Sequence, residues 1–115
     1  MGSAVLAFLA FGLVHVRAQS TYELNQEAEK NFVEADAELN KVYKQLCNKL
    51  ESADVEELRV AQRAWVQYRD AEANFNKDYE ARGGSMAGQV YLGIQARLTK
   101  ERTAMLRHIL KGEDW

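Results

Sequence analysis

A chain of 115 residues has the length of a single domain. With 47% hydrophobic and 28% charged residues it is too apolar for a disordered chain, and its net charge of −2 gives no basic patch of the kind that binds nucleic acid. Proline is absent, which favours long uninterrupted helices, and the single cysteine excludes an intrachain disulfide framework and a cysteine-based zinc site.

The beginning of the chain has the pattern of a secretory signal peptide. Residues 4–16 contain no Asp, Glu, Lys or Arg and are too short for a helix that crosses a bilayer, which needs roughly 20 apolar residues. Val16-Arg17-Ala18 places small or apolar residues at the −3 and −1 positions of a cleavage site before Gln19. We therefore expect a signal peptide over 1–18 and a periplasmic or secreted domain over 19–115, with no membrane anchor after cleavage. The alternative is an ordinary apolar helix, because no Lys or Arg precedes the apolar stretch.

A first helix is predicted over about 21–50. Ser20 and Glu23 fit a capping box, in which the serine accepts from the backbone and the glutamate reaches back. Apolar residues then recur at spacings of four and three, which indicates one buried face. These residues are Ala28, Phe32, Ala35, Leu39, Tyr43, Leu46 and Leu50.

Residues 52–54 interrupt this pattern, and Asp54 marks the start of a second helix. Its end is predicted at Arg82-Gly83-Gly84, because glycine tolerates the left-handed turn that follows many helices. The predicted apolar face comprises Leu58, Ala61, Trp65, Tyr68, Phe75 and Tyr79.

A third helix is predicted from Ser85, as its N-cap, to Gly112, which ends it. Gly88 and Gly93 lie inside this helix, where glycine is destabilising, so we interpret them as marks of a close helix approach. The predicted inner face comprises Val90, Ile94, Leu98, Met105 and Ile109.

Three helices joined by short connections predict an all-α, three-helix antiparallel up-down-up bundle. Residues that face each other in an antiparallel hairpin have a constant index sum, about 105 for the first hairpin and about 166 for the second. The predicted pairs are Asp36 with Arg69, Asp70 with Arg97, and Trp65 with Arg102.

Two strings of residues carry a resemblance to a known family. Residues 35–43 read A-D-A-E-L-N-K-V-Y, and residues 62–72 read Q-R-A-W-V-Q-Y-R-D-A-E. Together with the glycine turn and the L-T-K-E-R string at 98–102, they make residues 22–110 resemble the LprI-like lysozyme-inhibitor domain family of bacterial exported proteins. The motif residues are Asp36, Leu39, Asn40, Tyr43, Arg63, Trp65, Arg69, Asp70, Glu72, Thr99 and Arg102.

The resemblance implies an exported, non-enzymatic binding protein whose partner is a protein, with lysozyme inhibition as the named activity of the family. The alternative is a structural or envelope-stress interaction module without lysozyme activity. Relatives commonly carry cysteines where this chain has Glu27, Ala73 and Ile94, so this domain must depend on packing instead of disulfides. Cys47 lies elsewhere and is either a buried thiol or the site of an intermolecular disulfide.

Several of these residues admit two interpretations. Trp65 is either a core anchor or a ligand-stacking side chain. The Arg63, Arg69 and Asp70 side chains form either interhelical ion pairs or a polar recognition patch. Glu72 falls on an apolar stripe and needs a partner there. Because no second carboxylate or histidine is placed beside it, we expect no catalytic residue, no metal and no cofactor.

The turn Arg82-Gly83-Gly84-Ser85 is either ordinary helix punctuation or a protruding partner-binding loop. Its glycines allow close backbone approach, while Arg82 and Ser85 offer a cation and a hydroxyl. Since the catalytic pair of a lysozyme is two carboxylates in a concave cleft, this turn is the segment expected to enter it.

Overall fold

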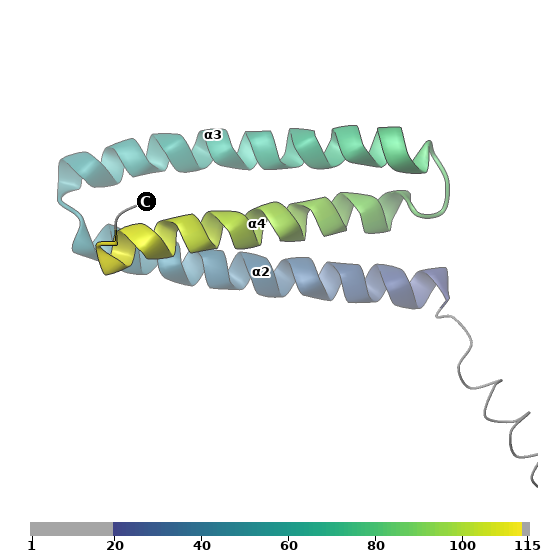
Figure 1. Cartoon of the computed structure of the whole chain (residues 1–115), viewed down its shortest axis with the longest axis horizontal. Coiled ribbons are helices and arrows are strands. Elements are labelled where there is room, and N and C mark those ends of the chain that lie inside the picture. The colour runs from purple at the N-terminus through teal and green to yellow at the C-terminus, as the bar shows by residue number, and fades with distance from the viewer. Residues whose placement is uncertain (1–19, 114–115) are drawn as a thin grey trace, which may run out of the picture.

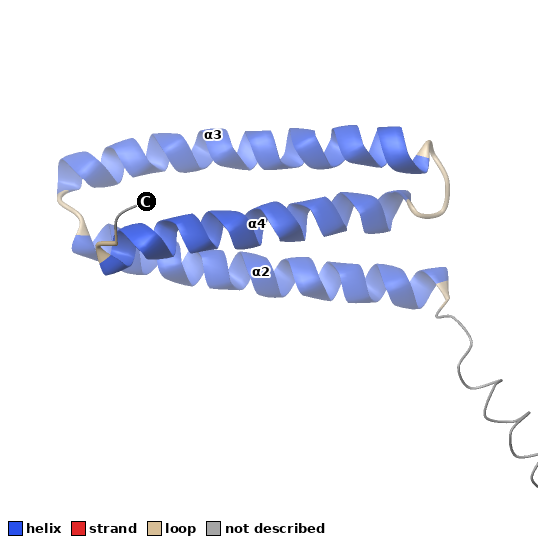
Figure 2. Cartoon of the chain, in the orientation of Figure 1, coloured by secondary structure: helices blue, strands red, loops and turns tan. Residues whose placement is uncertain are grey.

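A computed structural model describes residues 20–113 as three long helices joined by short connections. They are α2 (Thr21–Lys49), α3 (Ser52–Asn76) and α4 (Ala87–Lys111), and α3 continues into a short π-helical segment, η1 (Lys77–Ala81). Figures 1 and 2 show consecutive helices running in opposite directions, with no strand in the described range. The predicted all-α antiparallel bundle is therefore confirmed. The expected signal peptide, 1–18, lies outside the described residues.

The predicted ends of α2 hold with one difference. The backbone N–H of Glu23 donates to Ser20 Oγ at 3.2 Å, so Ser20 is the N-cap as expected. Within residues 20–113 the reciprocal bond from the Ser20 amide to the Glu23 side chain is not formed. The helix ends at Lys49, and the connection to α3 is only two residues long, so α2 and α3 run antiparallel.

Two predicted helix starts were wrong. The second helix begins at Ser52, with Glu51 as its N-cap, so Asp54 lies inside the first turn. The third begins at Ala87, with Met86 as an N-cap that offers no side-chain bond, so Ser85 does not cap it. The reason is that the turn extends further than the glycines, since the Ala87 amide still donates to the Gly84 carbonyl at 3.1 Å. The end at Gly112 is as predicted, with a left-handed φ of 70°.

Helix α4 is the centre of the bundle. It packs against both α2 and α3, whereas α2 and α3 approach each other less closely (Figure 1). The side chain of Arg107 on α4 pairs with Glu38 on α2, and Lys49 Nζ donates to the Leu110 carbonyl at 2.5 Å. The fully buried core joins α2 to α4 and consists of Leu39, Val42, Leu46 and Leu106.

Helix α3 contributes little to this core. Its two buried residues are Arg69 and Ala73, and its larger apolar side chains Leu58 and Trp65 are half-buried against the core. The prediction that Tyr68, Phe75 and Tyr79 form an inner face was wrong, because their exposed fractions are 53%, 60% and 62%. The apolar stripe of α3 is wider than the single surface of α4 that covers it, so its outer side remains in contact with solvent.

The predicted inner face of α4 was only partly correct. Leu98 is buried and Val90 and Ile94 are half-buried, but Met105 and Ile109 are exposed. Because α4 lies between two helices, it buries two of its faces. Polar residues outside the predicted apolar stripe are therefore buried as well. These polar residues are Gln95, Thr99 and Thr103.

The glycines inside α4 have different surroundings. A Cβ added at Gly88 would lie 3.6 Å from Asn25 Oδ1, so this glycine does lie beside α2. A Cβ added at Gly93 would meet nothing within 4 Å, so the expectation of a close approach there was wrong.

No helix within residues 20–113 is long and apolar enough to cross a membrane.

Candidate functional site

Arg69 organises the polar centre of the bundle. Its side chain is only 10% exposed, and its Nη1 lies 3.7 Å from Asp36 Oδ1 on α2. Its Nε donates to Asp70 Oδ1 at 2.8 Å, and the guanidinium lies over the rings of Phe32 and Trp65 at 5.2 and 5.3 Å. The predicted Asp36–Arg69 pair is confirmed. This cation is therefore satisfied by two carboxylates and two aromatic faces.

Asp70 connects this cluster to α4 through an amide. Gln95 Nε2 donates to Asp70 Oδ1 at 2.9 Å. Partial burial would raise the pKa of Asp70, but hydrogen bonds from Arg69 and Gln95 together with the charge of Arg69 bring that pKa below its ordinary value. The predicted Asp70–Arg97 pair was wrong. Arg97 instead pairs with Glu101, one turn along its own exposed helix face, at 3.0 Å.

Trp65 lies between the core and two cations. Besides Arg69, the guanidinium of Arg102 on α4 lies 5.9 Å from its ring centroid, as the predicted register requires. Arg102 Nε donates to Gln62 Oε1 at 3.0 Å, and burial lowers the pKa of the Arg102 guanidinium. One turn earlier on α4, Thr99 is fully buried and its carbonyl accepts from the Thr103 hydroxyl. Trp65 therefore packs against the core and also contacts the guanidinium groups of Arg69 and Arg102.

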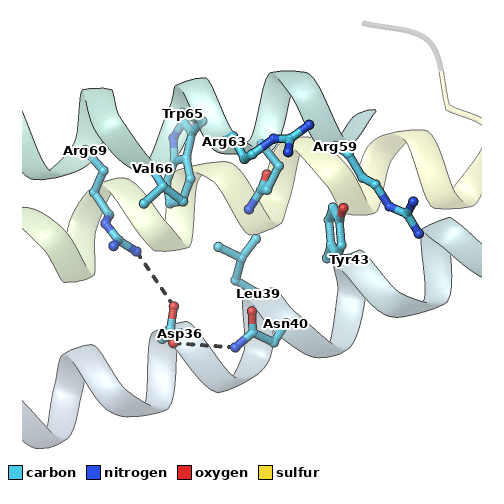
Figure 3. A pocket seen from close by; sticks show the side chains of 10 residues that line it. Asp36, Leu39, Asn40, Tyr43, Arg59, Arg63, Trp65, Val66 and Arg69 are labelled. Carbon is cyan, nitrogen blue, oxygen red and sulfur yellow. Dashed lines mark hydrogen bonds and ion pairs between the residues drawn. The ribbon is translucent and has the colours of Figure 1, made fainter. Parts of the chain in front are cut away.

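A groove of about 330 Å³ runs between α2 and α3 beside this cluster (Figure 3). The two sequence strings that carry the family resemblance lie on its opposite sides, one on each helix. Arg59, Gln62 and Val66 also line it and were not singled out from the sequence, although their spacing on α3 places them on the same face as Arg69. The lining residues are Asp36, Leu39, Asn40, Tyr43, Arg59, Gln62, Arg63, Trp65, Val66 and Arg69.

The α2 side of the groove carries an amide and a phenol. Asn40 Nδ2 donates to Asp36 Oδ2 at 3.5 Å, so it supports the carboxylate that faces Arg69. Burial and the neighbouring Cys47 raise the pKa of Tyr43, although Arg59 acts in the opposite direction. Cys47 is a free, half-buried cysteine one turn beyond Tyr43.

The turn between α3 and α4 stands at one end of the bundle (Figure 1). Arg82 has a left-handed φ of 47° and Gly83 a φ of 77°, so the chain leaves η1 sharply. The guanidinium of Arg82 lies 5.6 Å from the ring of Tyr79, which stacks on Phe75 at 5.9 Å and 14°. Gly83, Gly84 and Ser85 are exposed. The turn therefore presents one cation on a column of two exposed aromatic rings, which we call the tip stack (Phe75, Tyr79 and Arg82).

The tip stack was not predicted from the sequence, because the helical spacing assigned both aromatic residues to the apolar face of the second helix. The available signal was local, since Phe75, Tyr79 and Arg82 follow each other at spacings of four and three before the glycines. Phe75 and Tyr79 are four residues apart, which brings their rings to one side of the chain, and Tyr79 lies in the π-helical segment Lys77–Ala81. Such π segments occur often at functional sites.

Glu72 finds its partner in the Tyr68 hydroxyl, at 3.5 Å on the same helix. Among residues 20–113, no three His, Cys, Asp or Glu side chains gather as a group that could hold a metal ion. The groove and the turn offer cations, amides and aromatic faces, and aromatic residues and arginine are enriched at protein interfaces.

The fold defines a small all-α domain with exposed cations and aromatic rings, and its sequence is similar to known proteins. The family described as Lysozyme inhibitor LprI matches residues 15–106. The chain is 35% identical over 111 residues to an uncharacterized protein, R02472, of Rhizobium meliloti (strain 1021), a match that covers 85% of this chain and 79% of that protein. No solved structure matches it. The chain belongs to the LprI lysozyme-inhibitor family.

Proposed function

We propose that this protein is an exported, non-enzymatic inhibitor that blocks the substrate cleft of a lysozyme with the turn Arg82-Gly83-Gly84-Ser85. Membership of an inhibitor family supports a protein partner of this kind. The observation that carries the proposal is the tip stack, in which Arg82 lies over Tyr79 next to the turn at one end of the bundle.

The shape and chemistry of the tip fit a glycosidase cleft. The cleft is concave and contains two carboxylates, so a blocker needs a narrow convex segment that carries a cation or a hydroxyl. Arg82 supplies the cation and Ser85 the hydroxyl, while Gly83 and Gly84 add no side chain that would hold the backbone away. Exposed Phe75 and Tyr79 provide the aromatic anchors that dominate many interfaces.

The net charge of the chain also favours binding to lysozyme, but weakly. The chain carries a formal charge of −2, which favours the approach of a cationic glycosidase and contributes more to the association rate than to the final affinity. The bound state must then depend on the tip, where a single arginine meets the two acids of the cleft.

The proposed location is the periplasm or the exterior of the cell. It depends on removal of residues 1–18, whose apolar stretch and Val16-Arg17-Ala18 sequence favour a signal peptide. Intact-mass measurement of the exported protein should give a chain that starts at Gln19. Recovery of only the uncleaved chain from the exported fraction would contradict this part of the proposal.

The test of the mechanism is the double variant Arg82→Ala with Ser85→Ala. Its inhibition constant against lysozyme should rise at least about tenfold, because it loses a charge-assisted contact to the acids of the cleft. Arg97→Ala with Ser52→Ala is the matched control, since it removes the same two chemical groups from exposed positions away from the tip. Circular dichroism of each variant verifies folding.

Equal inhibition by the double variant and the wild type would remove the turn from the mechanism. Absence of inhibition by the wild-type protein would remove the lysozyme function itself. The chain would then be a structural or envelope-stress interaction module, and a pull-down from envelope extract would be the experiment that identifies its partner.

A further inference from the structure

The groove between α2 and α3 is a second surface, separate from the tip. Arg59 and Arg63 lie in the first half of α3, whereas the tip follows the end of that helix (Figure 1). The groove exists because α2 and α3 both pack on α4 more closely than on each other. A ligand bound in this groove would therefore be separate from the lysozyme contact proposed at the tip.

The three arginines that line the groove differ in how they are paired. Arg69 is held by Asp36 and Asp70, and Arg59 Nη1 donates to Glu56 Oε1 at 2.6 Å. Within residues 20–113, Arg63 forms no hydrogen bond or ion pair. Its five N–H donors are therefore available to an incoming acceptor.

Arg59 and Arg63 form a pair one helical turn apart. In Figure 3 the side chain of Arg63 extends along α3 toward Arg59, whereas the side chain of Arg59 points away from Arg63, past Tyr43. The Arg59–Glu56 bridge is more than half exposed on both sides, and exposed bridges contribute about 1 kcal/mol or less, so an incoming carboxylate can share or replace Glu56. Arg63 is therefore the arginine that can hold a carboxylate, while Arg59 adds positive charge one helical turn away.

The rest of the groove is apolar on one side and acidic at one end. Leu39, Trp65 and Val66 supply carbon surface next to the arginines. Asp36 lies at the Arg69 end and would repel a second carboxylate there, so an anion has one favourable position, beside Arg63. A groove of about 330 Å³ is near the lower limit of ligand sites, which suits one or two side chains and excludes a large cofactor.

We propose that this groove binds an acidic peptide segment of a protein partner, with a carboxylate held by Arg63 and a neighbouring apolar side chain packed on Leu39, Trp65 and Val66. Charge complementarity selects the carboxylate, since Arg63 is the unpaired cation of the lining. The apolar wall selects a peptide over a small hydrated anion, which would leave that carbon surface uncovered.

The test uses the purified full chain and a capped peptide, acetyl-Gly-Leu-Glu-Leu-Gly-amide, in a calorimetric titration at low salt. The same peptide with Gln in place of Glu is the ligand control. We expect the Glu peptide to bind and the Gln peptide to bind at least about tenfold more weakly, because only the former makes a charge-assisted contact. Inorganic phosphate and propionate at the peptide concentration should not displace the Glu peptide.

Variants locate the contact on the protein. Arg63→Ala should weaken binding of the Glu peptide at least about tenfold, Arg63→Lys should restore part of it, and Arg97→Ala should bind as the wild type does. Equal binding of the Glu and Gln peptides, wild-type affinity in Arg63→Ala, or no binding of the Glu peptide would overturn the proposal. Displacement by phosphate would also overturn it, since the groove would then be a simple anion site. None of these readouts involves lysozyme.

Discussion

Arg69 of α3 faces Asp36 of α2 across the bundle, with 3.7 Å between Nη1 and Oδ1, while Phe32 and Trp65 cover the guanidinium. This is the one large charged side chain that the described residues bury, and it bridges the two helices that pack least closely. The pair therefore links α2 to α3, whereas buried apolar side chains link α2 to α4.

Removal of this cation should destabilise the protein strongly. Arg69→Ala leaves Asp36 and Asp70 without their partner and removes contacts to two rings, so we expect a loss of about 2–4 kcal/mol in the free energy of unfolding. Arg97→Ala is the control, because its side chain is 56% exposed and its pair with Glu101 should contribute less than about 1 kcal/mol. Urea denaturation of both variants measures the difference. Similar losses in the two would mean that burial of Arg69 adds nothing.

Acid should reduce stability partly through Asp70. Folding lowers the pKa of this carboxyl from an ordinary value of 3.8, so its contribution is fully present above that pH and is lost as the pH falls through the lower pKa of the folded state. We expect the urea midpoint of Asp70→Asn to fall less between about pH 5 and pH 2 than that of the wild type. Asp78→Asn, at an exposed position, is the comparison, and an equal effect of the two substitutions would contradict the assignment.

A glycine in α4 offers a stabilising substitution. Gly93 lies in the middle of the helix with open space where a Cβ would be, so Gly93→Ala should raise the free energy of unfolding by about 0.5–1 kcal/mol. Gly112→Ala should do the opposite by about 1 kcal/mol, because its φ of 70° is unfavourable for a residue with a side chain. Thermal unfolding of both variants measures whether each substitution raises or lowers the free energy of unfolding. A destabilised Gly93→Ala would show that this part of α4 is more crowded than the structure indicates.

The exposed aromatic residues should be almost neutral for folding. Phe75→Ala and Tyr79→Ala should each cost about 1 kcal/mol or less, since their side chains remain more than half exposed. Leu39→Ala is the contrast and should cost about 2–5 kcal/mol, because it opens a cavity in the core between α2 and α4. Chemical denaturation compares the three. A large loss in Phe75→Ala would place that ring inside the bundle, as the helical spacing alone predicts.

The sequence by itself determined the number of helices, their order and the approximate register of the two hairpins, although the Asp70–Arg97 pair expected from that register was wrong. Capping at Ser20, the left-handed turn after η1 and the glycine at 112 are local effects of side-chain chemistry and backbone freedom, so they can be read from neighbouring residues. The short connections then fixed which residues face each other, and the Asp36–Arg69 and Trp65–Arg102 contacts follow from that register.

Only the tertiary structure decided which side of each helix is covered. Helical spacing identifies an apolar stripe, but it does not specify the neighbour that packs on it, and α4 covers two helices while α3 is covered by one. For this reason Phe75 and Tyr79 lie in solvent beside Arg82, and Gln95 is buried against Asp70 in place of Arg97. The groove has the same origin, since its two sides come from separate helices whose spacing depends on α4.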